Sequence, residues 1–251
     1  MKGYHDLGCP IGSSVLQYDF LILSLLFWIP GLGAYLARPD LRLAIRRSAL
    51  CSLPFAFTEF LFYTDYWTPT FLFDLGNLLG FGIEDFLFVS AVAAGAVSIY
   101  PVLASRTYAS QEAHLSPWFP IKRIASVFAA VLVLVVLARL LSVPMIYGCI
   151  AIMVLLSSGI MVVRCDLILP GLTSGLGVAV CYWILAKIYA WLYPGIFVAT
   201  WHTQGLINVF LFAVPVEELL YGAATGVCAV VVYAYAFGQR FVPLNDMRKH
   251  L

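Results

Sequence analysis

Long runs of apolar residues dominate this chain and restrict it to folds that can exist inside a lipid bilayer. A membrane-spanning helix needs about 20 consecutive apolar residues. Membrane barrels instead show an alternating apolar and polar pattern, which no segment of this chain has. We therefore expect an all-α integral membrane protein with about seven transmembrane helices, at residues 18–37, 48–63, 78–103, 124–142, 145–163, 167–190 and 206–237.

Composition supports a membrane protein and removes several classes of function. The chain is 63% hydrophobic and 11% charged, whereas soluble domains are about 45–50% apolar and about 25% charged. A net charge of +1 argues against a nucleic-acid partner. The six cysteines show no CxxC spacing, no two histidines have the spacing of metal ligands, and no GxGxxG is present. We expect no metal and no cofactor.

Basic residues predict the orientation of the chain. With seven spans, the basic residues of the first, third and fifth connections and of the C-terminal tail all fall on one face of the membrane. Positive residues accumulate on the cytoplasmic side, so the N-terminus is expected outside and the C-terminus in the cytoplasm. The residues concerned are Arg38, Arg42, Arg46, Arg47, Arg106, Lys122, Arg123, Arg164, Arg240, Arg248 and Lys249.

Two acidic pairs stand at the start of apolar runs, Glu84-Asp85 in FGIEDFLFVSA and Glu217-Glu218 in AVPVEELLYGA. A carboxylate at membrane depth costs at least about 2.5–3.5 kcal/mol on insertion scales, so such groups are rare and usually functional. Gly82 and Pro215 each lie two places before the first acid. Both residue types disturb helices, so we expect a broken helical turn beside the acids.

The two acidic pairs also indicate an internal repeat. Their neighbourhoods agree in character at an offset of 133 residues (84 to 217), and both helices are expected to run from outside to inside. The interpretation is a single transmembrane domain, residues 1–251, built from two parallel three-helix repeats, about 18–103 and 145–237, joined by a linking helix at about 124–142. Parallel repeats commonly enclose a site at their interface, so both acidic pairs are expected to face one cavity.

Buried acids among aromatic side chains suit chemistry on a hydrocarbon. Burial disfavours the charged form of a carboxyl, and a protonated carboxyl in a dry pocket is a Brønsted acid able to protonate an alkene. Glu59, near the outer end of the second helix, is a further candidate acid. Aromatic faces attract cations, and the candidate substrate-binding residues are Phe81, Phe86, Phe88, Asn77, Trp67, Phe212 and Tyr221. For Trp67 and Trp201 an interfacial aromatic belt is the alternative.

The sequence around the acids resembles a known family. Pro215-Val216-Glu217-Glu218-Leu219-Leu220-Tyr221 is similar to the PxEExxFF-type motif of the membrane-embedded lycopene cyclases. Gly82-Ile83-Glu84-Asp85-Phe86-Leu87-Phe88 resembles a first copy of this motif, and Asp65-Tyr66-Trp67 falls where the family has an acid and aromatics. Gly82 stands in place of proline, Asp85 in place of the second glutamate, and Leu220-Tyr221 in place of Phe-Phe.

The resemblance implies an isomerase that closes a ring at the end of a linear polyene such as lycopene. In such a reaction a carboxyl protonates the terminal double bond, a neighbouring alkene attacks the cation, and a base removes a proton. The candidate catalytic residues are Glu84, Asp85, Glu217, Glu218 and Glu59. The expected partners are an isoprenoid or carotenoid from the bilayer and membrane lipids; a second copy or second subunit is left open.

Two other functions fit intramembrane acids. A proton-coupled transporter would need an aqueous path to the acids and a more polar lining. A non-catalytic lipid-binding or partner subunit would use the acids only for pairing with each other, with Lys187 or with Arg139. Acids more than about 10 Å apart, with no cavity between them, would favour this last function.

Overall fold

The computed structural model describes residues 18–63, 65–111 and 118–247, and within them the chain is mostly helical. Among these described residues, six helices are long and apolar enough to cross a membrane: α2 (Asp19–Ala37), α5 (Ile83–Leu103), α6 (Trp118–Leu140), α7 (Met145–Val163), α8 (Ile168–Leu192, extended by the 3-10 turn η4, Cys165–Leu167) and α10 (Val216–Ala236). These helices confirm the expectation of a mostly helical protein with several apolar helices long enough to cross a membrane.

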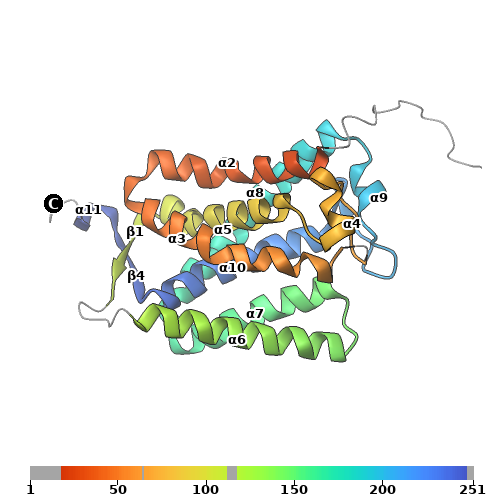
Figure 1. The fold of residues 1–251 in the computed structure, drawn as a ribbon. Coiled ribbons are helices and arrows are strands. Elements are labelled where there is room, and N and C mark those ends of the chain that lie inside the picture. The colour runs from red at the N-terminus through yellow and green to blue at the C-terminus, as the bar shows by residue number, and fades with distance from the viewer. Residues whose placement is uncertain (1–17, 64, 112–117, 248–251) are drawn as a thin grey trace, which may run out of the picture.

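The long helices form a bundle whose centre is α5, α8 and α10 (Figure 1). α2 packs on α5, α7 packs on α10, and α6 lies along the outside against α7 and α10. α2, α5, α7 and α10 run in the same direction, and the short helices α4 (Leu75–Leu79) and α9 (Ile196–Thr200) cover the end at which these four begin.

The second predicted helix, 48–63, is not a single α-helix. Its place is taken by α3 (Arg42–Ser52) and a 3-10 helix, η2 (Leu53–Leu61). Pro54 lies at the start of η2. Proline has no N–H to donate and its ring clashes with the carbonyl four residues before it, so the α-helix ends where Pro54 enters. This change explains why six rather than seven long helices are found.

Two other predicted helices begin later than expected. The prediction of a helix over 206–237 was wrong for its first ten residues: β2 (Phe210–Leu211) and β3 (Val214–Pro215) form a hairpin there, followed by α10. The helix predicted from 78 begins at Ile83, after η3 (Leu72–Asp74) and α4. Gly82 and Pro215 therefore do not break a helix; each is the residue that precedes its first turn.

Glycines allow α8 and α10 to approach closely. A Cβ added at Gly226 would lie 2.6 Å from the carbonyl oxygen of Ser174 and 2.9 Å from Cα of Gly175. One added at Gly175 would lie 2.6 Å from Val227. Small residues at such contacts let two helix backbones meet in a membrane, so these glycines allow the close packing of α8 on α10.

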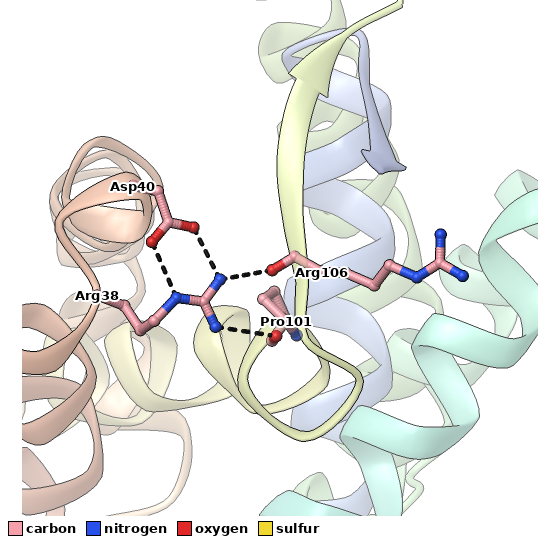
Figure 2. A network of polar contacts seen from close by, with 4 residues as sticks. All are labelled: Arg38, Asp40, Pro101 and Arg106. Atoms are coloured by element: carbon pink, nitrogen blue, oxygen red, sulfur yellow. Dashed lines mark hydrogen bonds and ion pairs between the residues drawn. The ribbon is translucent and has the colours of Figure 1, made fainter. Parts of the chain in front are cut away.

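A network around Arg38 holds the end of the bundle where α2 and α5 finish (Figure 2). Arg38 follows α2 and forms a two-point ion pair with Asp40 in η1 (Pro39–Leu41), at 2.9 and 2.8 Å. Its guanidinium also donates to the carbonyls of Pro101 (3.2 Å) and Arg106 (2.7 Å). Arg38 thus ties the end of α2 to the end of α5 and to the strand that follows it.

The same arrangement occurs after α7. Arg164 pairs with Asp166 at 2.8 and 2.7 Å, and donates to the carbonyl of Gln239 at 2.9 Å. Arg106 and Gln239 belong to two strands that pair antiparallel, β1 (Arg106–Ser110) and β4 (Gln239–Pro243), and a short helix, α11 (Leu244–Met247), follows β4. The sequence did not predict these strands; their pairing joins the two halves of the chain.

The Arg38–Asp40 pair predicts a pH-dependent contribution to stability. Partial burial of Asp40 opposes ionisation, but the hydrogen bonds and charge of Arg38 outweigh it and hold the pKa of this carboxyl below its ordinary value of 3.8. A carboxyl with a lowered pKa stabilises the fold above its ordinary pKa, and loses this effect as the pH falls through the folded-state value.

We therefore expect Asp40→Asn to destabilise the protein at neutral pH by about 1 kcal/mol. The difference from wild type should shrink as the pH falls from about 3.8 through the lowered folded-state pKa of Asp40, because below that value both proteins carry a neutral side chain at this position. Thermal unfolding in lipid nanodiscs at neutral and acidic pH measures this, and a difference that does not change with pH would contradict it.

Candidate active site

A cavity of about 300 Å³ lies between α3, η2, α5, α6, α7 and α10. Along α10 its wall extends from Glu218 to Phe237, which is about 28 Å of helix at 1.5 Å per residue. The cavity is therefore long and follows the helices. Its lining is mostly apolar, and three carboxyl-bearing residues, Glu59, Asp85 and Glu218, gather at the end where α5 and α10 begin.

Glu218 is surrounded by hydrogen-bond donors. Its Oε1 accepts from the Tyr66 hydroxyl at 2.6 Å and from the Trp201 indole at 2.9 Å, and its Oε2 accepts from the Tyr182 hydroxyl. Burial and the neighbouring Glu218 raise the pKa of Tyr66, so this hydroxyl remains a donor. Three donors around one carboxyl group match the needs of an ionised acceptor.

Asp85 and Glu59 have fewer partners. Asp85 accepts the backbone N–H of Gly82 at 2.7 Å, and Glu59 accepts from the indole of Trp67. The two acids come from different elements, Asp85 from the first turn of α5 and Glu59 from η2, yet they line the same cavity. Two neighbouring carboxyls in an apolar site resist losing both protons.

Glu84 and Glu217 are fully buried, but they do not line the cavity. Glu84 accepts the backbone N–H of Leu72 at 2.7 Å. Glu217 accepts from the Tyr147 hydroxyl at 2.9 Å and from the backbone N–H of Ile207 at 3.1 Å. The structure therefore divides each acidic pair, with its second member on the cavity wall and its first member turned toward a loop.

The aromatic candidates divide in the same way. Phe88, Trp67 and Tyr221 line the cavity. Phe81 and Phe86 instead pack on Phe57, outside the cavity lining. Two further candidates also lie elsewhere: Phe212 is 67% exposed and packs on Trp183, and Asn77 is exposed, accepting from Tyr63 and donating to Asp74.

Sequence reasoning missed three groups around the acids. Tyr182 was not singled out in its helix, and Trp201 was interpreted as an interfacial residue, yet both donate to Glu218. A buried tyrosine or tryptophan usually finds a hydrogen-bond partner, and this rule could have linked Tyr182 to an acid. Asp19 is another buried acid, 2% exposed, and accepts the backbone N–H of Phe20 at 2.7 Å.

The fold and the cavity define a class: a polytopic membrane protein with a mostly apolar cavity, named the chamber from here on, and a carboxyl cluster at one end of it. In the described part of the chain no group of three or more His, Cys, Asp or Glu side chains is arranged to hold a metal ion.

Residues 144–236 match the model of the lycopene cyclase family. No curated protein and no solved structure matches the chain. The family match confirms the resemblance noted from the sequence and covers α7 to α10, including Tyr182, Trp201, Glu217 and Glu218.

Proposed function

We propose that the protein is a membrane-embedded cyclase that closes a ring at the end of a linear, carotenoid-like polyene. The observation that carries this proposal is the meeting of Glu59, Asp85 and Glu218 at one end of an apolar chamber. The lycopene cyclase match of the second half of the chain supports it. The substrate is an isoprenoid taken from the bilayer, because the chamber is long and mostly apolar.

The hydrogen bonds around the acids suggest their roles. Glu218, with three donors, is suited to act as the ionised base. Glu59 and Asp85 line the same cavity and each accept one hydrogen bond among the described residues, so a negative charge on either is less well compensated than on Glu218. We therefore assign the proton donor to the Glu59–Asp85 pair and the base to Glu218.

The reaction is an isomerisation in which every atom is retained. The protonated carboxyl adds H⁺ to the terminal carbon–carbon double bond and leaves a tertiary carbocation. The π electrons of an internal double bond form the new ring bond, which moves the positive charge into the ring. Glu218 then removes a proton from the adjacent carbon to form the ring double bond. One proton enters and one leaves, so no oxidant or reductant is required.

Aromatic side chains around the acids are suited to the carbocation stage. Trp67, Trp201, Tyr66, Tyr182 and Phe88 all line the acid end of the chamber. The faces of such rings attract positive charge by about 0.5–2 kcal/mol each when water is excluded. An apolar wall also keeps water from trapping the cation.

We further infer that the chain is built from two parallel repeats. α2 and α7 each have 19 residues and are each followed by an Arg-x-Asp-Leu turn; α5 and α10 each have 21 residues with acids at their second and third positions. α3 together with η2 takes the place in the first repeat that α8 takes in the second, which brings the number of membrane crossings to seven. With Arg38 and Arg164 at the cytoplasmic end, the carboxyl cluster lies near the outer face.

The chamber can be tested by filling it. Ala229 lines the chamber two turns beyond Tyr221 on α10, away from the acids, whereas Leu220 on the same helix is 42% exposed and lies outside the lining. Ala229→Phe should reduce cyclic product at least about tenfold in a host that makes a linear polyene, and Leu220→Phe should leave it near wild type. Pigment analysis, normalised to the protein inserted in the membrane, measures both. Equal activity of the two variants would contradict this binding site.

A further inference from the structure

Glu84 and Glu217 occupy the same position in their helices, the second residue of α5 and of α10. Both side chains are 0% exposed, and neither lines the chamber. A fully buried carboxyl group is costly unless it is hydrogen-bonded. Their role is therefore not a direct contact with a molecule in the chamber.

Each of them is bonded to the loop that precedes its own helix. Glu84 accepts the N–H of Leu72, which begins η3, and Glu217 accepts the N–H of Ile207, which lies between α9 and β2. Tyr147 strengthens the second contact, since it donates to Glu217 and accepts from the same N–H of Ile207 at 2.9 Å.

The same two loops form the roof of the chamber, which we define as residues 66–68 and 200–202. The two segments are bonded to each other, because Thr68 donates to the carbonyl of Thr200 at 2.9 Å and His202 donates to that of Tyr66 at 2.7 Å. The roof carries three of the four side chains that donate to the chamber acids, namely Tyr66, Trp67 and Trp201.

We propose that Glu84 and Glu217 are positioning residues that hold the roof in place. They act on the reaction through the donors that the roof presents to Glu218 and Glu59, and they do not touch the substrate. Their effect on the reaction rests on the proposed cyclase function, whereas their effect on the loops does not.

Glutamine and alanine variants separate a positioning role from proton transfer. Glutamine keeps a carbonyl oxygen that accepts the loop N–H but has no acidic proton, whereas alanine removes the acceptor. We expect amide hydrogen exchange of residues 202–212 to rise about tenfold or more in Glu217→Ala and to stay within about threefold of wild type in Glu217→Gln. Cyclase activity should follow the same order, and glutamine should rescue most of the loss caused by alanine.

The corresponding variants of Glu84 should change exchange in residues 69–80. Leu72→Pro removes the N–H donor while leaving Glu84 intact, and Leu72 is the first residue of η3, where proline is tolerated. It should reproduce the exchange of Glu84→Ala. This variant keeps the test decisive if a buried alanine substitution prevents folding.

Glu218→Gln is the matched control, because it should lose activity while the N–H of Ile207, which Glu217 holds, exchanges as in wild type. A Glu217→Gln protein as inactive as Glu218→Gln, with wild-type exchange, would overturn the positioning role. Wild-type exchange in both alanine variants and in Leu72→Pro would overturn it as well. Hydrogen exchange is measured without substrate, so it tests the role of these two acids independently of activity. A wild-type protein that makes no cyclic product would refute the cyclase function but not the positioning role.

Discussion

Replacing Glu218 by glutamine is expected to reduce ring formation by at least about 100-fold, the range lost when a positioned acid or base is removed. Glutamine has nearly the same shape but cannot take up a proton. It also presents an NH₂ group to one of the donors that now surround the carboxylate, Tyr66, Trp201 or Tyr182. Cyclic product per amount of membrane-inserted protein is the measurement.

Tyr182→Phe should reduce activity less than Glu218→Gln does. It removes one of three hydrogen bonds to the carboxylate and leaves the carboxylate itself, so a loss of about tenfold is expected, which is about 1.4 kcal/mol. If Glu218→Gln were more active than Tyr182→Phe, the assignment of Glu218 as the base would be wrong.

Removing both candidate proton donors, with Asp85→Asn and Glu59→Gln in one protein, is expected to abolish cyclisation, with a loss of at least about 100-fold. Asparagine at 85 keeps an oxygen for the N–H of Gly82, and glutamine at 59 keeps one for the indole of Trp67. The fold should therefore survive, and circular dichroism with thermal unfolding checks this.

The two single variants show which acid supplies the proton. The variant that lacks the proton-donating acid should lose nearly as much activity as the double variant. The variant of the other acid should lose less activity, because that acid only affects the charge beside the donor. A correctly folded double variant that retains more than about a tenth of the wild-type activity would contradict the assignment of the donor to this pair.

The sequence predicted the helices well where apolar length alone decides them. α2 and α7 agree with their predicted ranges to within a residue, since nothing in them competes with a simple crossing. The prediction failed where local chemistry competes with hydrophobicity. At Pro54 the second predicted helix changes from α3 to the 3-10 helix η2. The turn at Phe212 and Ala213, both with positive φ, makes a hairpin in a segment whose apolar character predicted a helix.

The candidate site was predictable in its residue types and less so in its geometry. The acidic pairs and Glu59 stood out because carboxyl groups are costly in apolar runs. Which member of each pair faces the chamber depends on how α5 and α10 pack against their neighbours. The predicted starts of these two helices were also several residues too early. The donors Tyr182 and Trp201 come from segments distant in sequence from Glu59 and Asp85, so the fold was needed to join them.

Cyclisation carried out in heavy water tests the central claim most directly. If a carboxyl group of the chamber protonates the substrate, its exchangeable proton becomes deuterium, and each new ring should carry one deuterium from the solvent. Mass spectrometry of the product formed by the reconstituted wild-type protein should then show an increase of about one mass unit per ring. A cyclic product without solvent deuterium, or no cyclic product from the folded protein, would contradict proton-initiated ring closure in this chamber.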